Sequence, residues 1–294
     1  MAYAKSSYYK KVESVIRKLP DELVDLDIPR IKPPRPSLAS SEFLINRNMG
    51  VWSEGLVKTS IESSTKEYIA LKYGRSQNLV AGEPGFSKFY DDYEVELDDF
   101  GKRPDLLVFR KGDYYRKSKD LSKTSNDDIS ELVPRAILGL EVRSSSYLAK
   151  KFQPGKANPL GSLTFTIKVE DIVIILNWIR NTGVRHRYVQ VLFDEVHSIG
   201  FYTALKIIAE GTKNKDYTVN RVPKNQFKTT INVPLSRGIK IGDIVENPKL
   251  KAYRRELASG RLLHPVRFSG STITLIPDVW KKIFDKAARL KSSS

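Results

Sequence analysis

Two acidic residues lie within apolar stretches of the sequence where a carboxylate is unexpected. Asp105 begins the run DLLVF, and Glu141 lies near the end of the run AILGLEV. Side chains alternate across a strand, which places Glu141 and Arg143 on one face and Leu140 and Val142 on the other. A charge inside an apolar strand is costly to bury unless it is paired or binds a metal. Carboxylates on adjacent strands could hold Mg²⁺, which prefers oxygen ligands, polarises a phosphoryl group and activates water.

Each of these acids also has an ordinary interpretation. Pro104-Asp105 is a dipeptide common in turns, and a glutamate near a strand end is often a solvated or salt-bridged residue. Glu54, in the stretch GVWSEG, is a third candidate, although an acid near a helix N-terminus is favourable without any catalytic role. The residue types alone therefore leave a structural role open for all three.

Two basic residues lie close to these acids in the expected strands. Arg143 keeps its proton too tightly to act as a general base, but it can bind a phosphate and stabilise developing charge. The run LTFTIKV alternates strictly, with apolar residues on one face and Thr164, Thr166 and Lys168 on the other. We expect this polar face to border a cleft, with Lys168 either in a catalytic position or as an ordinary phosphate-contacting or surface lysine.

The elements that must position these residues follow from periodicity and from turn signals. We predict a helix at 53–73, strands at 93–97, 105–109 and 136–142, a helix at 170–180 and a strand at 188–193. The polar segment 110–131 is expected to be a long surface loop. A helix at 201–210, strands at 229–233 and 272–275 and a last helix from Pro277 follow. The strand, helix, strand order around 170–180 favours a parallel crossover.

The domain organisation expected from these elements is simple. Residues 1–44, with a short basic helix and four prolines between 29 and 36, are expected to form an N-terminal arm. Residues 45–294 are expected to form one elaborated α/β domain, with its core at about 45–211 and a C-terminal elaboration at 212–294.

Composition narrows the classes of function. The 294 residues include 50 Lys and Arg against 34 Asp and Glu, which gives a formal charge of +16 and favours nucleic acid as the partner. No cysteine is present, which excludes disulfides, thiolate zinc sites and a cysteine nucleophile. The sequence contains no glycine-rich phosphate loop, membrane-length apolar run or signal-peptide stretch, so we expect a cytoplasmic protein that does not bind membranes.

Basic residues with interleaved aromatics indicate where DNA could bind. One candidate group lies in and before the long polar segment: Arg110, Lys111, Tyr115, Arg116 and Lys117. A second group follows the Glu141 strand: Lys150, Lys151 and Lys156. Such charges mainly contact phosphates, so the residues that select a base sequence are not identified by this pattern.

The predicted order of elements resembles the αβββαβ core of PD-(D/E)XK nucleases. Pro104-Asp105 and Glu141-Val142-Arg143 fall where that family places its motif. The stretches GVWSEGLV, KYGRS, GKRPDLLVF, GLEVRSSS and FTIKVEDI further resemble the type II restriction enzymes related to AccI, over about residues 45–211.

The resemblance implies a fold, an activity and a set of roles. The fold would be a restriction-endonuclease-like α/β core, a central mixed sheet flanked by helices, with additional helices and strands. The chain would be a type II restriction endonuclease of a restriction-modification system, hydrolysing double-stranded DNA with Mg²⁺ to leave 5'-phosphates. A palindromic target would call for a homodimer. Asp105, Glu141 and Val142 would form the metal site, with Arg143, Lys168 and Glu54 as further catalytic residues.

This sequence departs from the family pattern in two ways. The last motif position, usually lysine, is Arg143, and Lys168 is a candidate to fill that role from another strand. The segment between Asp105 and Glu141 is also long, which leaves Asp98 or another acid as an alternative partner for Glu141. A structure-specific or repair nuclease, or a DNA-binding protein with a decayed active site, remain the alternative functions.

Overall fold

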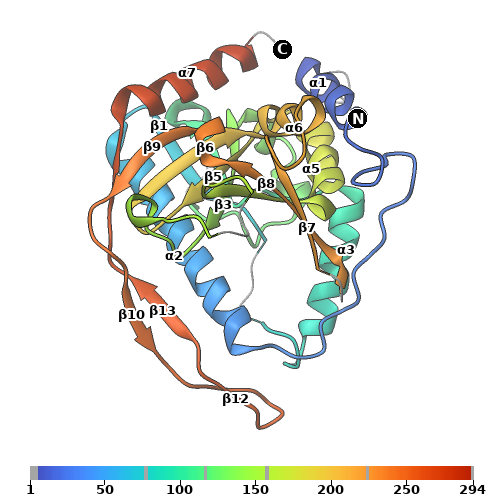
Figure 1. Ribbon diagram of the computed structural model, residues 1–294, viewed down its shortest axis with the longest axis vertical. Coiled ribbons are helices and arrows are strands. Elements are labelled where there is room, and N and C mark those ends of the chain that lie inside the picture. The colour runs from blue at the N-terminus through green and yellow to red at the C-terminus, as the bar shows by residue number, and fades with distance from the viewer. Residues whose placement is uncertain (1–5, 76–78, 116–117, 156–158, 223–224, 293–294) are drawn as a thin grey trace.

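A mixed seven-stranded sheet forms the centre of the computed structural model, which describes residues 6–75, 79–115, 118–155, 159–222 and 225–292 (Figure 1). Its strands, in spatial order, are β1 (Tyr68–Lys72), β2 (Leu106–Arg110), β3 (Leu138–Ser144), β5 (His186–Val191), β6 (Glu195–Gly200), β9 (Ile239–Ile244) and β14 (Ile273–Leu275). β3 and β5 pair in parallel, and the other neighbouring pairs of these strands are antiparallel. The α/β class expected from the sequence is confirmed.

Helices cover both faces of this sheet because its central strands are apolar on both sides. Leu106 and Val108 of β2 face a core built with helices α2 (Ser41–Ser64) and α7 (Pro277–Ser292). Leu107 and Phe109 of the same strand face a second core, built with α1 (Ser7–Ile16), α5 (Val169–Thr182) and α6 (Phe201–Glu210). This alternation is the two-residue period of a strand buried on both faces.

Smaller sheets extend the molecule beyond this centre. β4 (Thr164–Lys168), β8 (Asn225–Pro234) and β7 (Thr218–Val222) form a three-stranded antiparallel sheet. β10 (Lys249–Ala252) pairs with β13 (Val266–Ser269), and β11 (Arg255–Glu256) pairs with β12 (Leu262–Leu263). These two ribbons project at the lower left of Figure 1. Segment 110–131, predicted as a loop, contains the short helix α4 (Asn126–Ile129).

The first long helix and the first strand differ from the prediction. Helix α2 begins at Ser41, where the Ser40 side chain caps it by accepting from the Phe43 backbone N–H at 3.0 Å, and it ends at Ser64. Tyr68–Lys72, predicted as the end of this helix, is strand β1. Its apolar residues continue the helical spacing, but antiparallel pairing with β2 buries them more completely than one face of a helix would.

The strand predicted at 93–97 is also wrong, because these residues lie in helix α3 (Phe86–Asp99). The alternation of acidic and apolar residues in YEVEL resembles a half-buried strand. In the helix, however, Glu94 and Glu96 are buried in ion pairs with arginines, whereas Val95 is 55% exposed. The strand prediction assumed that the acidic residues face water, but in this helix they face inward.

The remaining predicted elements are confirmed with shifts of a few residues at their ends. They are β2, β3, β4, α5, β5, α6, β8, β14 and α7. The predicted parallel crossover of the strand directly before α5 onto β5 is wrong, because β4 pairs with β8 in a separate sheet and the parallel partner of β5 is β3. From the segment expected to be an arm, α1 contributes Tyr8 and Val12 to the core shared with α5 and α6. Within the described ranges, no helix is both long and apolar enough to cross a membrane.

Candidate active site

Asp105 and Glu141 lie beside each other on adjacent strands. Asp105 immediately precedes β2, and the antiparallel register pairs Leu106 with Leu140, one residue before Glu141. One carboxylate oxygen of Asp105, Oδ2, accepts a hydrogen bond of 2.7 Å from the backbone N–H of Val142. This bond fixes the Asp105 carboxylate against β3.

Glu141 is almost fully buried and is held by two cations. Its Oε1 lies 2.6 Å from the Lys102 ammonium and 2.9 Å from Nη2 of Arg143. Burial alone would raise the pKa of Glu141, but Lys102 and Arg143 lower it below its usual value. The second oxygen, Oε2, is buried without a hydrogen-bond partner among the described residues.

Asp171 joins the same cluster from the first turn of α5. Its Oδ2 lies 2.7 Å from the Lys102 ammonium and 3.0 Å from Nη2 of Arg143. Burial opposes ionisation, but the two cations outweigh it and lower the pKa of Asp171. Lys102, Glu141, Arg143 and Asp171 therefore form one buried network of two cations and two anions.

The sequence analysis did not identify Lys102 and Asp171 as site residues. Lys102 lies three residues before Asp105 in GKRPD, and Asp171 lies between Glu170 and the apolar residues of α5. Asp171 is 9% exposed, so an acid on the apolar face of a helix was the available signal. Ion pairing across distant segments explains why both residues can be buried.

Glu54 approaches the two carboxylates from helix α2. Burial and the charge of Glu141 raise the pKa of Glu54 to about 7, although Lys72 opposes this shift. The pKa of Asp105 is also well above its usual value, because of burial and the charges of Glu141 and Glu54. These three acids are therefore close enough for each to disfavour ionisation of its neighbours.

Lys168 stands at the end of β4, next to the same network. Asp171 attracts its charge and would raise its pKa, but dehydration and the positive charges of Lys102 and Arg143 lower it. The structure thus brings together Glu54, Asp105, Glu141, Arg143 and Lys168, which are the predicted catalytic residues. Asp98, the alternative partner, lies elsewhere on α3, where it pairs with Arg30 at 3.3 Å and Lys32 at 2.6 Å.

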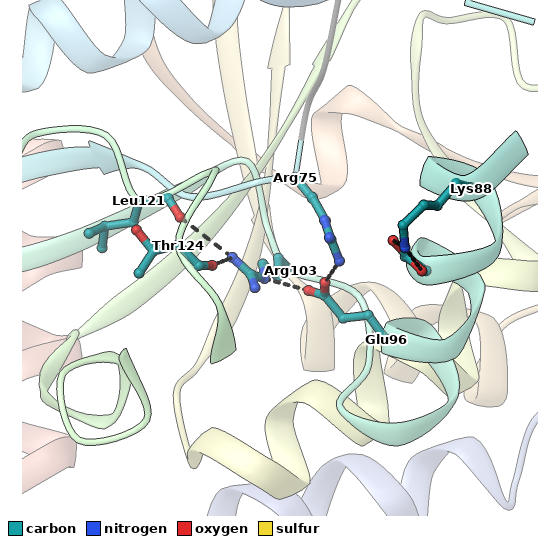
Figure 2. A network of polar contacts seen from close by, with 7 residues as sticks. Arg75, Lys88, Glu96, Arg103, Leu121 and Thr124 are labelled. Carbon is teal, nitrogen blue, oxygen red and sulfur yellow. Dashed lines mark hydrogen bonds and ion pairs between the residues drawn. The ribbon is translucent and has the colours of Figure 1, made fainter. Parts of the chain in front are cut away.

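A second ion network secures the segment that carries Lys102 and Asp105 (Figure 2). The buried Arg103 side chain bonds Glu96 of α3 at 2.5 Å and the Thr124 carbonyl at 3.0 Å. Arg75 pairs with the other oxygen of Glu96, and the guanidinium of Arg103 lies 5.0 Å from the centre of the Tyr73 ring. Arg103 lies between Lys102 and Asp105, so its contacts anchor the segment that leads into β2.

A cavity of about 1100 Å³ lies beside the first network, that of Lys102, Glu141, Arg143 and Asp171. Arg143 and Lys168 line it together with residues of the loop after β3 and of the sheet β4-β8-β7. The predicted polar face of β4, Thr164, Thr166 and Lys168, borders this cavity, as expected from its alternation.

The two predicted groups of DNA-binding residues lie in different places. Arg110 ends β2, five residues or roughly 16 Å along the strand from Asp105. Lys111 and Tyr115 follow it, and Tyr115 lies beneath the Arg135 guanidinium. Lys150 pairs with Asp243 at 3.4 Å, whereas Lys151 lines the cavity. Arg116, Lys117 and Lys156 lie outside the described residues.

The comparisons with known proteins bear on this arrangement. No curated protein and no solved structure matches the chain. The family model of the AccI restriction endonuclease matches residues 6–158 and 155–288, which together span nearly all of the chain. The resemblance inferred from the sequence motifs is confirmed, and the chain belongs to the AccI restriction endonuclease family.

Proposed function

We propose that this restriction endonuclease hydrolyses double-stranded DNA with Mg²⁺, at a PD-(D/E)XK site formed around Asp105 and Glu141. The observation that carries the proposal is the pair of neighbouring carboxylates in one buried network with Lys102 and Arg143. The products would be fragments with 5'-phosphates. The order α2, β1, β2, β3, α5 and β5, into which α3, α4 and β4 are inserted, supports the αβββαβ arrangement expected for such a core.

The chemistry of the donor groups supports a hard divalent cation, the type that restriction endonucleases generally use. Among the described residues, no three acidic or histidine side chains converge as a formed metal site. Glu141 nevertheless has one buried oxygen without a partner in that part of the chain, and burial and neighbouring acids raise the pKa values of Asp105 and Glu54. These groups would be stabilised by added positive charge.

Asp105, Glu141 and Val142 would hold the ion, with Glu54 near it. Mg²⁺ bound there would polarise the scissile phosphate and lower the pKa of a water molecule. Val142 would contribute through its backbone, because its side chain is apolar and its N–H already orients Asp105. In this proposal Asp105 and Glu141 carry the charge that recruits the ion.

The basic side chains of the site would act on the DNA phosphate. Arg143 and Lys168 both reach the cavity from the network, and both can bind an anionic oxygen. Lys168 would stabilise charge that develops during hydrolysis, because its ammonium is not engaged in an ion pair with Glu141. Lys102 would keep Glu141 and Asp171 ionised and in position.

Duplex DNA is the expected substrate, and a homodimer is the expected assembly for a palindromic target. The formal charge of +16 supports binding to a polyanion. We retain Lys150, Lys151, Arg110, Lys111 and Tyr115 as candidate phosphate contacts. Of these, Lys151 has the strongest support because it lines the cavity beside the network.

Cleavage of plasmid DNA by purified variants tests this function. We expect Asp105→Asn and Glu141→Gln each to lower magnesium-dependent cleavage by more than about 100-fold, because each removes a charge that recruits the ion. Binding to duplex DNA should persist and should weaken steeply with rising salt. Glu246→Gln, in the exposed turn between β9 and β10, is the matched control and should cut normally.

The products and the metal dependence complete the experiment. Chelation should stop cleavage and added Mg²⁺ should restore it, and ligation of untreated fragments would demonstrate 5'-phosphates. Discrete fragments indicate a sequence-specific enzyme, whereas cutting only at junctions or lesions indicates a structure-specific or repair nuclease. Near-normal cutting by either site variant would overturn the assignment. Binding without any cutting by the unmodified protein would indicate a decayed site.

A further inference from the structure

The three-stranded sheet β4-β8-β7 has one polar face and one apolar face. Its register aligns Thr166 with Asn232 and Asn232 with Thr218 across the three strands. Phe165 and Ile167, on the opposite face of β4, are buried in the core with α5. Strand alternation therefore presents hydroxyl and amide groups on one side while the other side holds the sheet in place.

This polar face forms one wall of the cavity next to the carboxylates. Six of its residues line the cavity: Thr164, Thr166, Lys168, Thr218, Asn220 and Asn232. The loop that follows β3 forms another wall, which includes Lys151, and Gln190 of β5 also lines the cavity. Lys168 of this face and Arg143 of β3 line the same cavity, so the polar face is continuous with the proposed site of hydrolysis.

The charge of the cavity differs from that of an ordinary solvated surface. Arg143, Lys151 and Lys168 supply positive charge, and none of the described lining residues is an aspartate or glutamate. A solvated sheet face in a chain with 34 acidic residues would be expected to carry both signs. Arg143 is also paired with Glu141 and Asp171, so Lys151 and Lys168 supply most of the positive charge that makes this lining complementary to a polyanion.

The neutral groups of the wall have the chemistry that distinguishes bases. The Thr166 hydroxyl lies 3.3 Å from Oδ1 of Asn232, and Nδ2 of Asn232 lies 3.4 Å from the Thr218 hydroxyl. These contacts fix the orientation of the amide, and Asn220 is exposed in the neighbouring row beside Lys168 and Thr230. Asparagine amides can make paired hydrogen bonds to adenine, and threonine hydroxyls can contact any base.

We propose that this face, made of Thr164, Thr166, Thr218, Asn220 and Asn232, contacts base edges of the DNA target next to the cut phosphate. The inference rests on the proposed nuclease function and adds to it the residues that select the sequence. Arg143, Lys151 and Lys168 hold the backbone, and the amides and hydroxyls read the bases. Three strands spaced about 4.8 Å apart span roughly 10 Å, which is comparable to the approximately 12 Å width of the major groove.

Cleavage of a random-sequence duplex library, followed by sequencing of the cut ends, tests the inference. The unmodified protein should yield one defined motif. Asn220→Ala and Asn232→Ala should each still cut but lose about tenfold discrimination at one or more positions of that motif. Asn247→Ala, an exposed asparagine in the turn between β9 and β10, is the matched control and should leave the motif unchanged.

The outcomes distinguish a failure of the base-reading role from a failure of the proposed nuclease function. An unchanged motif in both variants, with cleavage retained, overturns the base-reading role and leaves the nuclease intact. If a folded variant does not cut, selection of bound duplexes from the same library replaces cleavage, and an unchanged selected motif overturns the inference. If the unmodified protein cuts no duplex, the proposed function fails, and the same binding selection still decides whether this face reads bases.

Discussion

Lys102, Arg143 and Lys168 surround the acidic residues of the site, but their contacts differ. Lys102 lies within 2.7 Å of both Glu141 and Asp171, and Arg143 lies within 3.0 Å of the same two acids. Lys168 has no ion pair of this kind among the described contacts, and its side chain is exposed on the cavity wall. The first two cations therefore stabilise the buried acids, whereas Lys168 is available to a phosphate.

This difference predicts distinct effects of removing each lysine charge. Lys168→Met should lower the single-turnover cleavage rate by about 100-fold or more, with DNA affinity changed only a few-fold, because it removes charge stabilisation in the reaction. Lys102→Met should instead lower the free energy of unfolding by about 3–5 kcal/mol, because it removes one of the two cations of a buried network and leaves Arg143 alone against two buried carboxylates.

Rapid-quench cleavage and urea denaturation measure the two effects. Arg143→Met is the comparison for the contribution of the motif position itself. Unimpaired cleavage by Lys168→Met would return this residue to the role of a surface charge and leave Arg143 as the remaining candidate cation.

The sequence pointed to the acids of the apolar strands but missed one cation and one acid of the same network. Asp105 and Glu141 were recognisable because each interrupts an apolar strand, and strand pairing then brought them together. Lys102 and Asp171 belong to the site through contacts between segments about 70 residues apart. A short charged stretch such as GKRPD gives no indication of which of its cations is buried, because that depends on the acids supplied by other elements.

Helix α5 packs so closely against the segment between α3 and β2 that residue 101 of this segment must be glycine. Gly101 has a φ of +97°, and a Cβ added there would lie 2.3 Å from the Trp178 nitrogen and 2.4 Å from the Ile174 oxygen. The backbone N–H of the next residue, Lys102, donates to the Ile174 carbonyl at 2.9 Å. This close approach brings Lys102 to Asp171 on the same helix.

We therefore expect Gly101→Ala to destabilise the fold by about 3 kcal/mol or more, since it adds both an unfavourable φ and a backbone clash. Thermal unfolding should register the loss, and cleavage should fall as Lys102 moves. Gly112→Ala is the matched control, because a Cβ there meets no atom within 4 Å and its stability should change by less than about 1 kcal/mol. Equal stability of the two variants would show that α5 can shift without cost.

The elements that the sequence mispredicted have a common physical cause. Local periodicity identifies a half-buried strand or an amphipathic helix when polar residues face water. In α3, Glu94 and Glu96 face inward toward arginines, and in β1 both faces are buried. By contrast, α6 and α7 place most polar residues outward and apolar residues inward, as does α5 apart from the buried Asp171 and Thr182, and their predictions hold.

His186 of β5 stands in the core shared by α1, α5 and α6, and it is 1% exposed. Its ring packs against Trp178, Tyr188 and Phe201, with centroid distances of 6.2, 5.4 and 5.3 Å. Neither ring nitrogen has a hydrogen-bond partner among the described residues. Burial, helped by the positive charges of Lys102 and Arg143, lowers the pKa of His186 to about 4.

This depressed pKa links the stability of the whole molecule to pH. An unfolded histidine titrates near pH 6.5, so below that pH the unfolded chain binds a proton that the folded chain excludes. The stabilisation is fully present above pH 6.5 and is lost as pH falls towards about 4. A shift of this size corresponds to a loss of up to about 3 kcal/mol.

His186→Leu should remove this dependence. We expect the free energy of unfolding of the unmodified protein to fall between pH 6.5 and pH 4 by up to about 3 kcal/mol more than that of the variant. Urea denaturation at several pH values gives both curves, and their difference reports the titration of His186 together with its effect on the pKa of Glu141. Parallel curves over this range would mean that His186 gains a proton in the folded state as readily as in the unfolded chain, which its apolar and aromatic surroundings oppose.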